Sequence, residues 1–211
     1  MEQRSDFEHL KTIFQNYINA LICEYFNRKM NYREADVSDL KGIVKVQIDT
    51  WKKTYNGIVS ADYLQGLSYD DKEQNWKQRL ENPTHGAKIF VAETEQQGIV
   101  GFALTTLEKY NPLLVSIQPD KFVGELCAIY VLKEFQNKKI GTQLIKLVIE
   151  YLLKNNIKSM IVWVLKQNPY YRFYEKMGGQ YIGEQSIEIG GKKYIEKAYG
   201  WENIVSIFSI Q

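Results

Sequence analysis

The sequence has few of the residues from which metal sites and disulfide frameworks are made. It contains two cysteines, Cys23 and Cys127, and two histidines, His9 and His85. Neither pair has the close spacing of a metal-binding motif. We therefore predict that there is no metal site, and that the thiols are reduced, as in cytoplasmic proteins.

A large excess of one charge and a long apolar run are also missing. The 27 basic and 25 acidic side chains are interspersed and leave a formal net charge of +2, which favours neither nucleic acid nor a membrane as the main partner. No apolar run approaches the roughly 20 residues of a membrane span, and the N-terminal stretch lacks a signal-peptide pattern. We expect a cytoplasmic location.

The remaining composition is that of a folded protein of ordinary size. A chain of 211 residues with 45% hydrophobic side chains suits one domain with an additional terminal element. Residues 5–28 predict that element, an amphipathic helix with an aromatic-rich apolar face. Three interpretations stay open: the helix packs on the domain, it pairs with a second copy in a homodimer, or it is an extension upstream of a start at Met30.

The stretch Gly124–Tyr151 reads as a strand, a polar turn and a helix. Leu126, Ile129 and Val131 belong to the strand, and the helix has an apolar face with steps of three and four residues. A helix that starts after a turn points unpaired N–H groups and its positive dipole end at that turn. The turn therefore predicts a phosphate site, and the simpler alternative is a plain turn with solvated lysines.

The spacing in this turn distinguishes between families of phosphate sites. The glycines of a Rossmann fingerprint and the Gly-Lys-Ser/Thr of a P-loop are absent. The order Gln136-x-x-Lys139-x-Gly141 resembles the acetyl-CoA pyrophosphate loop of the GNAT superfamily of N-acetyltransferases, whose pattern is Gln/Arg-x-x-Gly-x-Gly/Ala. Lys139 replaces the first glycine, which would be unfavourable if this position needs a positive φ.

A second segment, residues 167–179, supports the same resemblance. Asn168 and Pro169 are a strong helix start and Gly178 a natural helix end. The segment is similar to the second GNAT signature, with Tyr171 where Ala is common and Gly179 in place of Phe. The resemblance spans residues 30–202, which divides the chain into an N-terminal helical extension (1–29), an acetyltransferase domain (30–202) and a C-terminal tail (203–211).

The resemblance implies an α/β fold. We expect a mixed, mostly antiparallel twisted sheet flanked by helices, with a V-shaped cofactor cleft and an extra N-terminal helix. The sequence itself predicts a helix that starts after Asp36, one helical region over 60–81, and a parallel strand–helix–strand unit ending in the strand 158–165. It also predicts strands over 30–35, 88–93, 99–106, 180–189 and 192–201.

The resemblance also implies where acetyl-CoA binds. A bulged strand opposite the splayed start of the Ile161 strand would hold the pantetheine arm through its backbone. A backbone N–H near Val131 would polarise the thioester. The implied cofactor-binding residues are Ile129, Tyr130, Val131, Gln136, Asn137, Lys138, Lys139, Ile140, Gly141, Thr142 and Asn168.

Two residues are candidates for the proton transfers. By resemblance, Tyr174 would be the general acid for the leaving thiolate, and its alternative is a core tyrosine. Glu125 is the best candidate for the general base, ahead of Glu134 and Asp120, and its alternative is an ordinary surface or ion-paired acid. Cys127 has no partner that suggests a nucleophile.

The acceptor cannot be identified from the sequence beyond its chemistry. We predict acetyl transfer from acetyl-CoA to a primary amine of a small molecule or peptide, with a non-catalytic acyl-CoA-binding regulatory module as the alternative. Trp51 and Tyr55 are either substrate-binding walls or core aromatics. Four acids would attract a cationic acceptor or simply form a solvated helix face: Asp62, Asp70, Asp71 and Glu73.

Overall fold

The computed structural model describes residues 8, 11–15, 30–108 and 121–209. These contain one seven-stranded sheet in the order β1-β2-β3-β4-β5-β7-β6. Its strands are β1 (Met30–Glu34), β2 (Lys88–Thr94), β3 (Gly98–Thr106), β4 (Gly124–Val131), β5 (Met160–Leu165), β6 (Gln180–Ile189) and β7 (Lys192–Trp201). The helices are α2 (Leu40–Thr54), α3 (Ala61–Gln65), α4 (Tyr69–Glu81), α5 (Ile140–Lys154) and α6 (Arg172–Lys176), with short 3₁₀ helices η1 (Val37–Asp39), η3 (Lys133–Phe135) and η4 (Ile204–Ser209).

The sheet is mixed, and only one of its strand pairs is parallel. β4 and β5 run parallel, whereas every other neighbouring pair runs antiparallel. The segment that joins β4 to β5 contains α5, as expected for a strand–helix–strand unit. The predicted fold class, a mostly antiparallel sheet flanked by helices, is confirmed.

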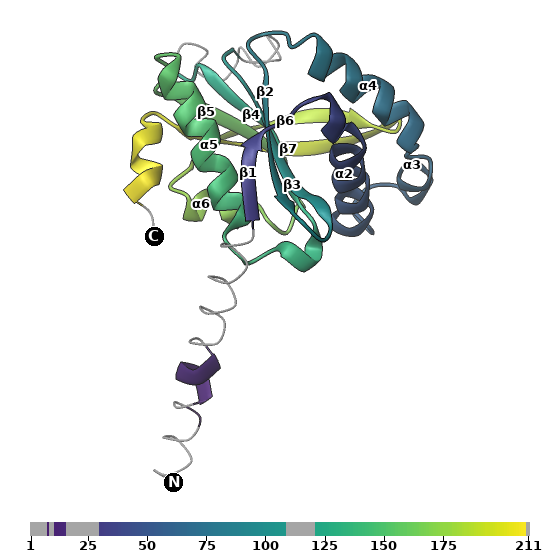
Figure 1. The fold of residues 1–211 in the computed structure, drawn as a ribbon, viewed down its shortest axis with the longest axis horizontal. Helices are drawn as coiled ribbons and strands as arrows, with labels where there is room; N and C mark the ends of the chain where they lie inside the picture. The colour runs from purple at the N-terminus through teal and green to yellow at the C-terminus, as the bar shows by residue number, and fades with distance from the viewer. Residues whose placement is uncertain (1–7, 9–10, 16–29, 109–120, 210–211) are drawn as a thin grey trace.

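Helices cover both faces of the sheet (Figure 1). α5 packs on β2, β3 and β4, and α2 packs on β3 and β4 from the other side with α4 beside it. The apolar face predicted for α5 is the face that it buries. Its buried side chains are Ile140, Leu144, Ile145, Val148, Ile149 and Leu152. This packing fixes the N-terminus of α5 close to the end of β4.

The 3₁₀ helix η1, which leads directly into α2, has the predicted capping pattern. The Asp36 side chain accepts a hydrogen bond from the Ser38 N–H, and the Asp39 side chain accepts one from the Asp36 N–H, which completes a capping box. Asp39 is buried, and Arg33 donates to both of its carboxylate oxygens at 2.6 and 2.8 Å. Arg33 also donates to Glu93, so the buried charge is compensated.

The region 60–81 forms two helices rather than the single predicted one. α3 ends at Gln65, and α4 begins after Ser68, whose side chain accepts a hydrogen bond from the Asp71 N–H at 3.2 Å. A serine in this position satisfies an N–H group that the start of a helix leaves unpaired. The sequence does contain the signals of this break, since Gly66 is the C-cap of α3 and Ser68 the N-cap of α4, and the prediction overlooked them.

The segment after β5 also differs from the prediction. Asn168 Oδ1 accepts a hydrogen bond from the Tyr170 N–H at 2.8 Å, which is an Asx turn, and the regular helix α6 begins only at Arg172. The end of α6 is as predicted, because Gly178 has a φ of 78° and follows its last turn.

The folded domain extends further toward the C-terminus than predicted. β6 and β7 join at the predicted turn, where Gly190 and Gly191 have φ values of 57° and 74°. Residues 203–211 were expected to be a tail, but η4 lies among them and buries Ile204 and Ile207 in the main core. The folded unit therefore continues at least to residue 209.

Most of the predicted N-terminal helix, residues 5–28, lies outside the described residues. The part of it that is described, residues 8 and 11–15, is helical. The homodimer and the separation of residues 1–29 from the domain stay predictions. Most of the connection 107–121 also lies outside the described part of the chain. Within that part, no helix is both long and apolar enough to cross a membrane.

Candidate active site

The parallel strands β4 and β5 pair at one end and separate at the other. The register joins Gly124 to Met160 and Leu126 to Val162, and goes no further. The prediction that the strands diverge at the start of β5 is therefore wrong, because the start of β5 is the paired end. The opening lies beyond Leu126, because β5 leaves β4 there while it stays paired with β7 on its other side along its whole length.

A bulge in β4 coincides with this separation. Leu104 of β3 faces Ala128, and the next residue, Thr105, faces Leu126, so that Cys127 is the extra residue. A bulge bends a strand and increases its local twist. The predicted bulge is therefore present, and it begins where β4 leaves β5.

The far half of β4 has an edge with backbone groups that face the opening. Val131 lies opposite Gly101, and the Leu132 N–H donates to the Val100 carbonyl, which makes Val131 and Gly101 a non-hydrogen-bonded pair. The Val131 N–H and carbonyl consequently point away from β3, as do those of Ile129 two residues earlier. The Gln136 side chain donates to the Val131 carbonyl at 3.1 Å from that side.

The turn before α5 has an unusual backbone. Asn137 and Lys139 both have a φ of 60°, and Lys139 is in the left-handed conformation directly before the helix. A left-handed residue followed by a right-handed one makes backbone N–H groups converge into an anion-binding concavity. The position at which Lys139 replaces glycine therefore does need a positive φ, and the lysine adopts it with strain.

Gly141 has a different requirement from the residue before the helix. It has no positive φ, but a Cβ atom at this position would lie 3.2 Å from the Phe173 ring of α6. The small side chain lets α5 and α6 approach each other. The second glycine of the motif thus serves packing, and it brings the segment that carries Tyr174 close to the phosphate-type turn.

A cavity of about 400 Å³ lies beside this turn, and we name it the smaller cavity. Two of its lining residues have buried side-chain oxygens without a hydrogen-bond partner among the described residues, Thr50 Oγ1 and Gln136 Oε1. Buried polar atoms normally have a partner, so orphaned ones beside a cavity suit a polar ligand. The lining residues are Asp49, Thr50, Lys52, Lys53, Thr54, Asn56, Leu132, Lys133, Gln136 and Tyr170.

Hydrogen-bonded aromatic residues from α2, β4 and the Asx turn meet near the opening. Trp51 Nε1 donates to the Tyr130 hydroxyl at 3.0 Å, and Asn168 Nδ2 donates to the Tyr55 hydroxyl at 3.0 Å. The Trp51 and Tyr55 rings lie 4.7 Å apart. Both belong to a hydrophobic cluster of the core and do not line the described cavities, so their contact with a substrate stays a prediction.

Tyr174 is buried on α6 and stacks on Tyr199, with ring centroids 6.1 Å apart. Burial, and secondarily the nearby Tyr130, holds the pKa of the Tyr174 hydroxyl well above its usual range. The pKa of Tyr55 is raised in the same way, mainly by burial, with Tyr130 and Tyr174 as neighbours. These hydroxyls are therefore close enough to interact and stay protonated at neutral pH.

A second cavity, of about 720 Å³, lies between α4, α2 and the central strands, and we name it the larger cavity. Glu125 lines it and is only 8% exposed. Burial and, next, the Glu125 charge raise the pKa of the Cys127 thiol to about 12, which makes a nucleophilic thiolate unfavourable. The lining residues are Gln47, Lys72, Asn75, Trp76, Gln78, Arg79, Asn82, Thr84, Ala87, Leu104, Thr106, Glu125, Cys127, Ala128 and Tyr130.

The weaker candidate Glu134 is not among the residues that line either cavity. Glu134 lies on the surface, 3.4 Å from Lys53, and Asp120 lies outside the described residues. Sequence reasoning missed the cavity-lining residues of α4. Lys72, Trp76 and Arg79 follow each other at steps of four and three, so the helical period would have placed them on one face. Nothing local indicated that this face lines a cavity.

Comparisons with known proteins agree with this geometry. A family model described as the acetyltransferase (GNAT) family matches residues 49–179. The uncharacterized N-acetyltransferase YuaI of Bacillus subtilis (strain 168) is 35% identical over 175 residues, covering 83% of this chain and 94% of that protein. The spermidine N(1)-acetyltransferase of Thermoplasma acidophilum is 25% identical over 149 residues, which cover 69% of this chain and 85% of that protein. Among solved structures, the PaiA N-acetyltransferase of Thermoplasma acidophilum in complex with coenzyme A matches with a TM-score of 0.56 and 22% identity, covering 80% of this chain and 97% of that one.

Proposed function

The chain belongs to the GNAT acetyltransferase family and is an acyltransferase, and from this premise we propose that it transfers the acetyl group of acetyl-CoA to a primary amine of a small molecule or peptide by direct attack. One observation carries the proposal. The separation of β4 from β5 begins at the bulge at Cys127, between the turn that starts α5 and the larger cavity. A thioester held in the opening would therefore be accessible to an amine in the cavity.

The cofactor would be held mainly by backbone groups. The left-handed Lys139 and the first turn of α5 offer N–H groups and a helix dipole to the pyrophosphate, in the segment Gln136, Asn137, Lys138, Lys139, Ile140, Gly141 and Thr142. The outward backbone groups of Ile129 would pair with the pantetheine arm. Tyr130 and Val131 follow on the same strand, and the Val131 N–H is left for the thioester carbonyl, since the Val131 carbonyl already accepts from Gln136. The unpaired Thr50 and Gln136 oxygens of the smaller cavity fit a ligand with amide and phosphate groups. Asn168 would also contact this arm; its Nδ2 donates to the Tyr55 hydroxyl and its Oδ1 accepts from the Tyr170 N–H, which fixes the orientation of the side chain.

The chemistry needs an oxyanion donor and two proton transfers. The amine nitrogen attacks the thioester carbon, and the Val131 N–H is available to the carbonyl oxygen as charge develops there. The C–S bond then breaks, and the thiolate receives a hydrogen bond from Tyr174. The second proton transfer takes the extra proton from the attacking nitrogen, directly or through water, to the thiolate, so that the products are a neutral amide and CoA. Because the pKa of Tyr174 is raised, and a thiol ordinarily titrates near 8.5, a strong hydrogen bond is easier than complete proton transfer at this stage.

Glu125 would remove a proton from the acceptor. An alkylammonium group has a pKa of about 10, so little free amine exists at neutral pH. Glu125 is buried and lines the larger cavity, which supports its assignment as the proton acceptor for an amine that enters there. The ammonium proton would pass to Glu125 directly or through a water molecule, and the attacking nitrogen would then be neutral.

Thermal unfolding with ligands tests the proposal. Acetyl-CoA and CoA bind the native state only, so at a concentration of 100 Kd either should stabilise it by about 2.7 kcal/mol. This corresponds to a rise in Tm of about 5 to 10 °C, whereas NAD is expected to cause no shift.

Release of free CoA in the presence of amines then tests transfer. Binding without release on any amine would favour the regulatory module, and no binding at millimolar ligand would contradict the proposal.

The strained turn makes a further prediction. We expect Lys139→Gly to stabilise the fold by roughly 0.5 to 1 kcal/mol, because a non-glycine residue in the left-handed region costs about 1 to 2 kcal/mol and part of this gain is lost to chain entropy. Urea denaturation at a fixed pH measures the difference. Lys138→Gly is the matched control: it removes the same charge at a position without positive φ and is expected to destabilise. Equal effects of the two substitutions would show that φ is not the cause.

A further inference from the structure

Two basic and one acidic side chain line the larger cavity among the residues that the structure describes. Its charged lining residues among those described are Lys72, Arg79 and Glu125. Lys72 and Arg79 come from α4, and Glu125 comes from the opposite wall, at the start of β4. An acceptor in this cavity would therefore meet one buried carboxylate on the sheet side and two cations on the helix side.

Arg79 is held by an aromatic contact, and its charge reaches the bulge of β4. Its guanidinium lies over the Trp76 ring, 5.8 Å from the ring centroid, and Trp76 is itself buried and donates to Gln47 at 2.7 Å. The positive charge also reaches the bulge, because Arg79 acts to lower the pKa of the Cys127 thiol against the larger effects of burial and Glu125. The charges of Arg79 and Glu125 thus both influence the Cys127 thiol, with opposite effects on its pKa.

The acidic residues of the same region face elsewhere. Asp62, Asp70, Asp71 and Glu73 do not line the larger cavity. α4 presents Lys72, Trp76 and Arg79 to it, with the amides of Asn75, Gln78 and Asn82. A polyamine carries positive charge along its whole length and would be repelled by two cations at this wall, whereas an anionic group would be attracted and bonded.

We propose that the acceptor is an amine that also carries an anionic group, a carboxylate or a phosphate. Its ammonium end lies toward Glu125 and the opening of the strands, and its anionic end lies against Arg79 and Lys72, with carboxamides between the charges. This inference rests on the acetyl transfer proposed above and names the substrate class for that site. It distinguishes this chain from the relative named for spermidine.

Pairs of amines that differ only in the anionic group test the inference. L-lysine is compared with cadaverine, 4-aminobutyrate with propylamine, and O-phosphoethanolamine with ethanolamine, and spermidine is added as the cationic extreme. Release of free CoA gives kcat/KM for each. We expect the anionic member of at least one pair to exceed its partner by about tenfold or more, with the preference falling as salt is added. The pair that shows the preference distinguishes carboxylate from phosphate.

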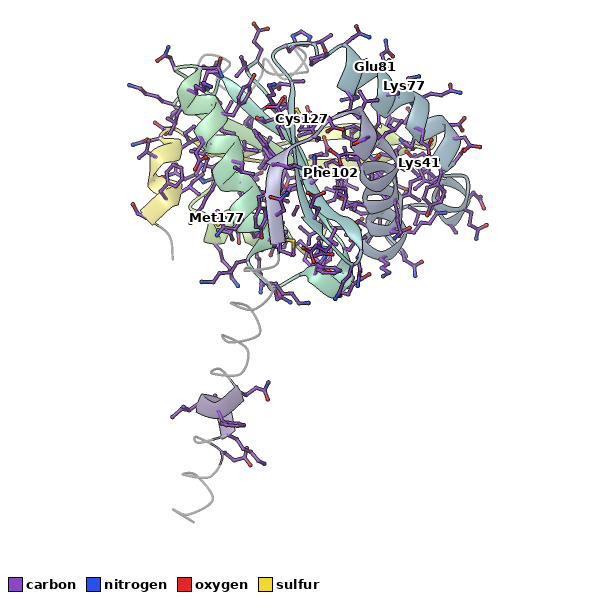
Figure 2. The ribbon with its side chains drawn as sticks, in the orientation of Figure 1. Lys41, Lys77, Glu81, Phe102, Cys127 and Met177 are labelled. Atoms are coloured by element: carbon purple, nitrogen blue, oxygen red, sulfur yellow. The ribbon has the colours of Figure 1, made fainter. Side chains whose placement is uncertain are left out.

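Variants of α4 then locate the preference. Arg79→Gln and Lys72→Gln should each raise KM for the preferred amine several-fold and change kcat little, and Arg79→Glu should shift the preference toward cadaverine. Lys77→Gln is the matched control, since Lys77 forms an ion pair with Glu81 at 3.8 Å and does not line the cavity. Figure 2 labels Lys77 and Glu81 on α4, and it labels Cys127 on the sheet at a distance from them. Lys77→Gln should leave KM unchanged.

Two results would overturn the inference in distinguishable ways. If cadaverine or spermidine is acetylated as well as the anionic amines, the substrate class is wrong while acetyl transfer stands. If no amine releases CoA from a protein that binds acetyl-CoA, the proposed function fails, and the inference fails with it.

Discussion

Replacing Tyr174 by Phe is expected to lower kcat by about 10² to 10⁴-fold, the usual contribution of a positioned proton donor. The leaving thiolate would lose a hydroxyl that is buried near Tyr130 of β4 and that stays protonated because burial raises its pKa. The rate of CoA release at saturating acetyl-CoA and amine measures the loss. The Kd of acetyl-CoA should change less than about threefold, because the hydroxyl acts on charge that develops only in the transition state.

Tyr174→Phe should lower kcat without a large change in the free energy of unfolding, so a loss of activity can be distinguished from a loss of fold. Within the described residues the Tyr174 hydroxyl has no hydrogen bond, and the ring packing on Tyr199 is kept by Phe. We expect the free energy of unfolding to change by no more than about 1 kcal/mol. Tyr181→Phe is the control: Tyr181 is exposed on β6 and also contacts Tyr199, and this variant should retain full activity. Unchanged kcat in Tyr174→Phe would remove Tyr174 from the mechanism.

The second large effect is expected for Glu125→Gln. At neutral pH, kcat/KM should fall by about 10² or more, because the acceptor ammonium would lose its buried proton acceptor. The deficit should shrink as the pH rises toward about 10, where the free amine becomes abundant without a base. A pH profile of kcat/KM over roughly pH 6.5 to 9.5 measures both effects. A purely structural role of Glu125 would give a deficit that does not depend on pH.

Glu134→Gln is the matched control for this experiment. Glu134 lies in η3, shortly after β4, but it is on the surface and pairs with Lys53 at 3.4 Å. The same chemical change there should leave the pH profile intact. If both variants lose activity in the same way, the loss reflects the charge of this region and not a base at Glu125.

The fold could be predicted in large part because its signals are local. The apolar face of α5, the capping box at Asp36 and the Gly190-Gly191 turn each follow from a few adjacent residues, and each is confirmed. The division of 60–81 into two helices was missed because the Gly66 and Ser68 cap signals were not weighed against the helical composition of the region. The burial of Ile204 and Ile207 was missed because these residues reach the core only after the whole sheet has formed.

The candidate site depended more strongly on tertiary structure. The Lys139 position illustrates this: the sequence stated the two alternatives, and the fold decided for positive φ because the turn must connect the end of β4 to a helix that is anchored on the sheet. Likewise, the sequence placed the divergence of the strands at the wrong end of β5. Strand register is a property of two distant segments, and neither segment contains it alone.

The sequence by itself determined the order of strands and helices, the phosphate-type turn before α5 and the family to which the chain was compared, because periodicity, caps and motif spacing are encoded in neighbouring residues. Only the tertiary structure decided which residues share a cavity. Glu125 and Arg79 are 46 positions apart, yet both line one cavity because α4 packs against α2, which in turn packs on β3 and β4. Their opposite charges gain a chemical meaning, a site for an amine with an anionic group, only through that packing.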